Sequence, residues 1–298
     1  MKHSRAVALM IVVTLLWSSA GVVTRHLDSA RSFEVTFWRS AFNALVLAFL
    51  LTATRGPALW RGLLRAPALV WASGLCWAVM FTAFMVAITL TAVANVLVTM
   101  AIGPLLTALL ARLVLGHRLA PSTWGAIALA GIGIAWMFGH EAQASAPGQL
   151  LGILVATGVP IAAAINWTLL HHSHHGVSDA AEDMPSAVLI GAMISAAVTL
   201  PLAWPLQASA HDLSLLALLG AFQLAVPCLL VVRLTRVLPA PEIALLGLLE
   251  VVFGVAWAWL GAGEQPSLAT LGGGALVLGA LVANEALALH AAAVQRAA

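Results

Sequence analysis

Polar side chains are scarce in the apolar stretches of this sequence, so the few that occur there are the candidates for chemistry. Glu250 lies midway along one stretch, and Asn166 and Gln223 lie midway along two others. A carboxylate or amide in a lipid interior is costly, and such a residue usually has a function or bonds another helix. Glu250 could bind an amine or a proton, or pack as a hydrogen-bonded structural residue. The two amides could hold the charged groups of a zwitterion, or bond neighbouring helices.

A second polar group follows helical spacing. Asn95, Thr99 and Gly103 are each four residues apart, so they share one face of a helix. Pro104 stands next to that face, and a proline inside a helix kinks it. This face is predicted to form a cavity wall. The alternative is that its small and polar residues hold two helices together.

Aromatic residues supply the other candidate walls. Trp17 and Trp167 each offer a broad apolar face with one hydrogen-bond donor, which suits amphipathic solutes. Trp77, Met80, Phe81 and Phe84 form a bulky stripe at helical spacing, which could line a cavity or face lipid or core. The predicted substrate-binding residues are Trp17, Met80, Phe84, Asn95, Thr99, Asn166, Trp167, Gln223 and Glu250.

Two further features are interpreted as structural. Arg39 lies about six residues inside an apolar stretch and is expected to extend to the outer interface or to reach Glu34. The run His171-His172-Ser173-His174-His175 contains imidazoles of the kind that bind zinc. No matching set of His and Asp occurs inside the apolar stretches, so a polar cytoplasmic loop is favoured. The sequence predicts neither a metal site nor a cofactor.

Composition decides the class of protein. Of 298 residues, 62% are apolar and 8% are charged, and the mean hydropathy is +1.03. Soluble domains carry about 25% charged residues, so lipid must be the main solvent of this chain. A net charge of +2 without a basic stripe excludes a nucleic-acid footprint. Cys76 and Cys228 lie inside apolar stretches and are interpreted as core residues rather than a disulfide.

The apolar stretches predict an all-α membrane protein of about ten transmembrane helices. Each stretch is close to the roughly 20 residues that cross a bilayer as a helix. The first is interpreted as an uncleaved helix rather than a signal peptide, because many similar stretches follow. The stretches are 6–24, 34–54, 67–89, 92–115, 122–139, 148–170, 185–206, 213–234, 241–261 and 267–289.

Basic residues predict the orientation of these helices, because cytoplasmic loops carry an excess of Lys and Arg. Ten basic residues fall on one side and two on the other, which predicts a bacterial inner-membrane protein with both termini in the cytoplasm. The cytoplasmic set is Lys2, Arg5, Arg55, Arg61, Arg65, Arg112, Arg118, Arg233, Arg236 and Arg296, and the outer set is Arg25 and Arg31.

The two halves of the chain resemble each other. The segment 115–119, followed by 123–126, is echoed by 262–266 followed by 270–273, and Trp17 is matched by Trp167. Because each half has five predicted helices, an odd number, the second half is inverted relative to the first. The predicted units are 1–140 and 148–298, around a central cavity.

Four motifs resemble the drug/metabolite transporter superfamily, in its EamA branch, which includes amino-acid exporters of the YddG type. The motifs are Leu16-Trp17-Ser18-Ser19 with Arg25, Phe37-Trp38-Arg39-Ser40, Gly103 to Leu119, and Leu249-Glu250-Val251 with Gly263-Glu264. The sequence departs from the family pattern at His117, where Glu is usual, and at Val251, where Pro is usual. The resemblance implies two inverted five-helix repeats, with a cavity mainly from helices 1, 3, 4, 6, 8 and 9.

These observations predict a secondary transporter or facilitator that exports small organic solutes by alternating access. Amino acids, including aromatic ones, or related metabolites are the expected substrates, and protons are a candidate coupling ion. A divalent-metal carrier with a His-rich cytoplasmic loop is one alternative, and a membrane-embedded enzyme is another. The sequence has no nucleotide-binding P-loop and no clustered nucleophile and base inside the apolar stretches, so catalysis is not expected.

Overall fold

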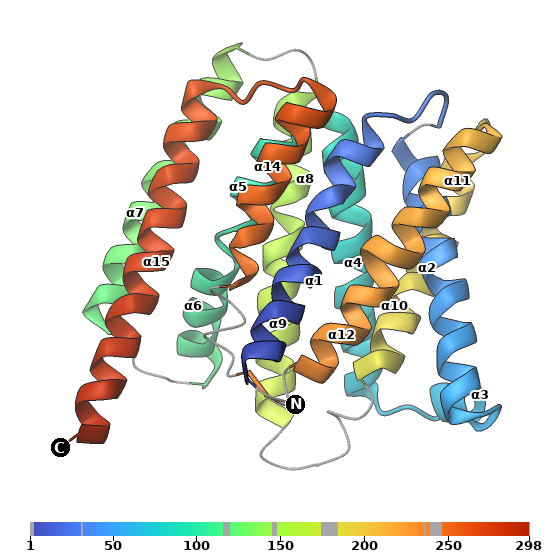
Figure 1. Cartoon of the computed structure of the whole chain (residues 1–298), viewed down its shortest axis with the longest axis horizontal. Coiled ribbons are helices and arrows are strands. Elements are labelled where there is room, and N and C mark those ends of the chain that lie inside the picture. Colours follow the sequence, from blue (N-terminus) through green and yellow to red (C-terminus); the bar gives the residue numbers. More distant parts are fainter. Residues whose placement is uncertain are drawn as a thin grey trace.

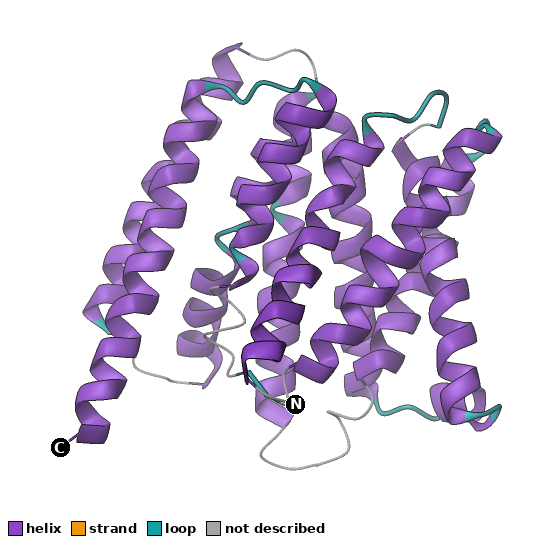
Figure 2. Cartoon of the chain, in the orientation of Figure 1, coloured by secondary structure: helices purple, strands orange, loops and turns teal. Residues whose placement is uncertain are grey.

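The chain folds into a bundle of helices that run roughly side by side (Figure 1). The computed structural model describes residues 3–30, 32–115, 120–144, 148–173, 184–234, 237–238 and 246–297. Throughout these ranges the regular secondary structure is helical, without a strand (Figure 2). The prediction of an all-helical fold is confirmed.

Every predicted apolar stretch contains helix. The first half comprises α1 (His3–Thr24), α2 (Ser32–Arg55), α3 (Ala58–Leu64), α4 (Ala68–Leu90), α5 (Val93–Met100), α6 (Gly103–Leu115) and α7 (Pro121–Ala144). The second half comprises α8 (Gln149–Ala156), α9 (Gly158–Ser173), α10 (Met184–Ala203), α11 (Ala210–Leu218), η1 (Leu219–Ala225), α12 (Val226–Leu234), α14 (Leu249–Ala262) and α15 (Leu268–Ala297). The short helix α3 was not predicted.

Within the described residues, seven helical stretches are long and apolar enough to cross a membrane, and two shorter apolar helices accompany them. The seven are 3–24, 32–55, 68–90, 93–110, 149–166, 185–203 and 210–231, and the shorter two are 249–262 and 268–284. A multi-span membrane protein is therefore confirmed, while the number ten stays a prediction.

Three of the predicted stretches are not regular α-helices. The fourth divides into α5 and α6, with Pro104 in the first turn of α6, and the sixth divides into α8 and α9, with Pro160 in the first turn of α9. Proline is tolerated there because first-turn N–H groups have no partner within the helix. The eighth contains the π-helix η1, directly before Val226-Pro227. Pro227 lacks the N–H that would donate to the carbonyl of Gln223, which explains why the helix widens here into a π-helical turn.

The packing of the helices has a two-fold pattern. The ten predicted stretches are numbered here in chain order, so the first corresponds to the sixth and the fourth to the ninth. The first stretch contacts the ninth (α1 with α14), and the sixth contacts the fourth in the same way (α9 with α6). Likewise, the third stretch contacts the sixth (α4 with α9), and the eighth contacts the first (α12 with α1). Helix α1 runs upward in Figure 1, whereas α8 and α9 run downward. The two halves thus make corresponding contacts in opposite directions.

Helices α7 and α15 form a close pair at the left edge of the bundle in Figure 1. A Cβ added to Gly273 would lie 2.6 Å from the carbonyl oxygen of Gly133, and one added to Gly133 would lie 2.7 Å from that of Gly273. Only glycine allows this approach of the two backbones, as at other small-residue contacts between membrane helices. This close contact holds α7 and α15 together at the edge of the bundle.

Candidate binding cavity

A cavity of about 150 Å³ lies inside the bundle. Its walls come from α1, α2, α4, α5, α9, η1, α12 and α14, and therefore from both halves of the chain. Drug-sized ligands occupy pockets of about 300–1,000 Å³, so this cavity suits a small solute and must widen for a bulky one. The described residues that line it are Trp17, Arg39, Trp77, Met80, Phe81, Phe84, Met100, Val159, Gln223, Leu224, Cys228 and Glu250.

The cation of this cavity is Arg39, on α2, which is only 2% exposed. Its Nε and Nη2 donate to Oε1 of Gln223 over 3.1 and 2.8 Å, and its Cζ lies 5.6 Å from the centre of the Phe84 ring. The prediction that Arg39 extends outward or reaches Glu34 is wrong. Glu34 Oε1 accepts instead from the backbone N–H groups of residues 207 and 208, each over 2.7 Å.

Gln223, in η1, connects three helices. While its Oε1 accepts from Arg39, its Nε2 donates to the backbone carbonyl of Trp17 over 3.0 Å. The widened turn of η1 therefore places an amide between α1 and α2, and π-helical turns often occur at functional sites. Both the oxygen and the nitrogen of the Gln223 amide have a partner, so this amide holds the Arg39 guanidinium in one orientation through Nε and Nη2.

Two donors in the cavity have no such partner. Nη1 of Arg39 and Nε1 of Trp77 are buried, and neither has a hydrogen-bond partner among the described residues. Glu250, at the start of α14, lines the same cavity as Arg39, but no ion pair within 4.0 Å joins them. The site thus combines a guanidinium, a carboxylate and an apolar wall of aromatic and thioether side chains.

Five of the nine predicted binding residues line this cavity, namely Trp17, Met80, Phe84, Gln223 and Glu250. The cavity also contains residues that the sequence reasoning left out, of which Arg39 is the most important. Trp77 and Phe81 could have been included, because they share the helical stripe of Met80 and Phe84. Met100 and Cys228 are ordinary apolar residues that carry no signal in the sequence.

Two of the other predicted residues, Asn95 and Thr99, belong to a different contact. Asn95 donates from Nδ2 to Oγ1 of Thr91 over 3.2 Å, and its Oδ1 accepts from Oγ1 of Thr270 over 2.6 Å. Thr99 Oγ1 donates to the backbone carbonyl of Asn95 over 2.7 Å. The alternative reading of this face, as polar residues that hold helices together, is the one that the structure supports. Neither Asn95 nor Thr99 belongs to the cavity lining.

Asn166 and Trp167 belong to α9. The side chain of Asn166 is completely buried, and both its amide atoms lack a partner among the described residues. It is not part of the cavity lining. The side chain of Trp167 lies outside the described residues, as do those of the histidines 171 and 172 and the whole of His174 and His175. Among the described residues, no group of three His, Cys, Asp or Glu could hold a metal ion.

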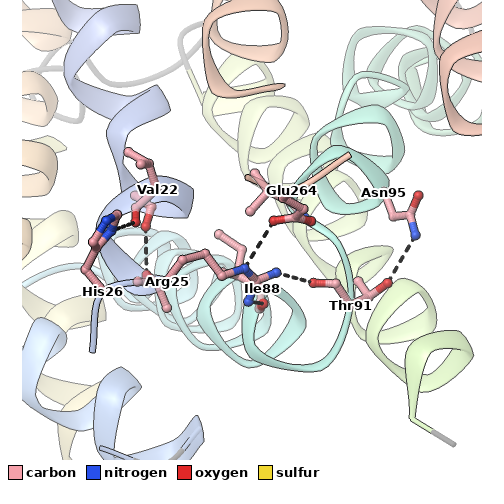
Figure 3. A network of polar contacts seen from close by, with 10 residues as sticks. Val22, Arg25, His26, Ile88, Thr91, Asn95 and Glu264 are labelled. Carbon is pink, nitrogen blue, oxygen red and sulfur yellow. Dashed lines mark hydrogen bonds and ion pairs between the residues drawn. The ribbon is translucent and has the colours of Figure 1, made fainter. Parts of the chain in front are cut away.

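A polar network joins the ends of several helices (Figure 3). Arg25, just after α1, donates from Nε to Oε2 of Glu264 over 3.1 Å. Its Nη1 and Nη2 each donate over 2.8 Å, to the backbone carbonyls of Ile88 and Thr91. Glu264 in turn accepts from the backbone N–H of Val93 over 2.6 Å. One ion pair therefore connects the ends of α1 and α14 to the turn between α4 and α5.

A second network lies on the same side of the bundle. The carboxylate of Asp212, which is fully buried, accepts from the backbone N–H groups of residues 28, 29 and 30 over 2.7, 3.1 and 3.0 Å. It also accepts from the Ser209 N–H and the Ser29 hydroxyl, over 3.2 and 2.8 Å. This carboxylate ties the loop after α1 to the start of α11, so the loops on this side are held in place.

Comparison with known proteins identifies the family of the chain. The model of a family described as "EamA-like transporter family" matches residues 4–139 and again residues 150–284. No curated protein matches the chain. A solved structure titled "Crystal structure of protein" is 20% identical, with a TM-score of 0.65, over 97% of this chain and 99% of the other. That likeness shows a shared fold.

Proposed function

Because the chain belongs to the EamA-like transporter family and is a multi-span membrane transporter of small solutes, we propose that it exports amino acids, including aromatic ones, by alternating access. The arrangement of the central cavity carries this proposal. Arg39 and Glu250 supply opposite charges, and an apolar wall stands beside them. An amino acid with an apolar side chain carries the complementary set of a carboxylate, an ammonium group and a hydrophobic body.

Glu250 is assigned to the ammonium group of the substrate. It comes from the second half of the chain, while Arg39 comes from the first, so a bound zwitterion would contact both halves. In transporters built from inverted repeats, substrate sites lie between the repeats near the midplane of the bilayer. Protons compete with ammonium groups for such a carboxylate, so Glu250 is also the candidate for proton coupling.

The proposed architecture is ten transmembrane helices in two inverted repeats, residues 1–140 and 148–298. The matched packing of the halves, their opposite directions and the double family match support it. The excess of basic residues on one side supports a bacterial inner-membrane protein with cytoplasmic termini. On that assignment, the networks of Arg25 and Asp212 hold the outer side closed, as alternating access requires of one state.

Flux into proteoliposomes tests the proposal. Purified protein in proteoliposomes should exchange radiolabelled amino acids from a panel, and the flux is measured with and without a proton gradient. Liposomes without protein should show no such exchange. Trp17→Ala should reduce flux because it removes an aromatic wall of the cavity. Trp124→Ala should not, because Trp124, on α7, is 48% exposed and does not line the cavity. Absence of flux for every amino acid, or equal flux in the two tryptophan variants, would contradict the proposal.

A further inference from the structure

We propose that Arg39 selects the substrate by binding its carboxylate through Nη1. The inference rests on the proposed function, and it goes further by naming the residue and the chemical group that decide which solutes are carried. It predicts that amino acids are substrates while their amides, esters and decarboxylated amines are poor ones. Three observations support it: the guanidinium is buried, no carboxylate contacts it among the described residues, and its orientation is held by neighbouring groups.

Among the described residues, no acidic side chain contacts the Arg39 guanidinium directly. A buried charge is normally paired, since removing it from water without a counter-charge is very costly. Arg39 is 2% exposed, and within the described part of the chain no carboxylate oxygen lies within 4.0 Å of it. Gln223 offers only a neutral oxygen. The guanidinium therefore has no counter-charge in direct contact with it, and it can pair with an anionic group of a ligand.

The guanidinium also keeps a donor free in the cavity. Gln223 occupies Nε and Nη2, so Nη1 is the nitrogen left without a partner among the described residues. Trp77 adds a second buried donor, Nε1, to the lining of the same cavity. A carboxylate has two oxygens that accept such donors, and charge-assisted bonds to a guanidinium are among the stronger ones in proteins.

The guanidinium is held in place before a substrate arrives. The Trp17 carbonyl fixes Gln223, Gln223 fixes Arg39, and the Phe84 ring lies against the guanidinium. A donor that is already oriented loses little conformational entropy on binding, which increases affinity. Gln223 therefore acts as a positioning residue, and the connection from α1 through η1 to α2 serves recognition as well as packing.

Matched pairs of compounds test the role of Arg39. The probes are L-phenylalanine with L-phenylalaninamide, and L-leucine with L-leucinamide, measured as ligands of the full chain in detergent and as substrates in proteoliposomes. The wild-type protein should prefer each acid over its amide. Arg39→Gln should reduce the affinity for the acids by about 10- to 100-fold and leave that for the amides nearly unchanged. Arg61→Gln, on exposed α3, removes a charge outside the cavity and should have no effect.

Two further variants guard against a folding defect in Arg39→Gln. Arg39→Lys keeps a cation but loses the planar fork, so the preference for acids should shrink without vanishing. Gln223→Glu places a carboxylate of the protein where the neutral acceptor stands, and this group should pair with Arg39 and compete with the substrate. Well-folded Gln223→Glu protein, monitored by size-exclusion chromatography and melting temperature, should lose its preference for acids.

The outcomes separate this inference from the proposed function. Wild-type protein that transports amino acids and amides equally well, or Arg39→Gln protein that keeps the preference, would overturn the inference and leave the proposed function standing. Wild-type protein that neither binds nor transports any acid would overturn both. A preference for acids that Gln223→Glu leaves intact would also contradict the role of Arg39.

Discussion

The ion pair between Arg25 and Glu264 should control how often the outer side opens. If the proposed orientation is correct, the pair must separate when the ends of α1 and α14 move apart. Glu264→Gln removes the charge but keeps an oxygen that can accept the Val93 N–H, so the turn before α5 should persist. The substitution therefore tests the ion pair alone. Its expected effect is a larger population of the outward-open state.

The size of this effect follows from the exposure of the pair. The side chains of Arg25 and Glu264 are 28% and 17% exposed, so water screens their interaction in part. A charge-assisted hydrogen bond contributes about 1.5–3 kcal/mol when buried, and exposed pairs contribute at most about 1 kcal/mol. We expect about 1 kcal/mol here, which is roughly a five-fold change in the ratio of open to closed protein.

Cys228 reports this change directly. It lines the cavity and is buried, and with Cys76 replaced by Ser it is the one thiol in the chain. A membrane-impermeant maleimide applied from outside should label Cys228 about five-fold faster in Glu264→Gln than in the parent protein. Asp28→Asn is the matched control, since this exposed residue on the same side belongs to neither network through its side chain. Equal or slower labelling of Glu264→Gln would refute the reasoning.

Three other predictions concern the site, the orientation and the packing. Glu250→Gln should lower amino-acid flux and flatten its dependence on pH, and a pH profile of flux identical to wild type would remove the coupling role. In a cysteine-free background, an impermeant probe added outside should label Gln265→Cys and miss Gly62→Cys, and the reverse pattern would invert the topology. Gly273→Val should lower the melting temperature and the yield of folded protein because its side chain would collide with α7, whereas Gly279→Val should not, since a Cβ there meets nothing within 4 Å. Equal stability of these two variants would contradict the close contact.

The helices could be predicted because lipid leaves few alternatives. A span must satisfy its backbone hydrogen bonds internally and expose apolar side chains, so composition and length suffice to find it. All ten predicted stretches contain helix for this reason. The helix α3 was missed because its seven residues are too few for a span and too short for a clear periodic pattern. Pro104 did indicate the break before α6, while nothing short of the structure showed the widened turn at η1.

The binding residues were harder to predict, because distance along a helix does not determine the direction of a side chain. Asn95 and Thr99 do share a face, and they even bond to one another, yet that face meets α15 and not the cavity. The position of Arg39 along its helix was predicted correctly, but its hydrogen-bond partner was not. Its partner Gln223 lies 184 positions away in the sequence, and only the fold brings the two together.

The two-fold pattern of the fold explains the shape of the site but not its polarity. Trp17 and Trp167 are 150 positions apart, and the same offset relates Arg39 on α2 to Leu189 on α10, a fully buried apolar residue. The helices α2 and α10 pack together as counterparts, yet of these two helices only α2 has a described residue in the cavity lining, and that residue is the cation. A symmetric cavity would accept a solute in either orientation. Because the cation and Glu250 come from positions that the repeat does not duplicate, the proposed zwitterionic substrate would bind in one orientation only, with its carboxylate toward α2.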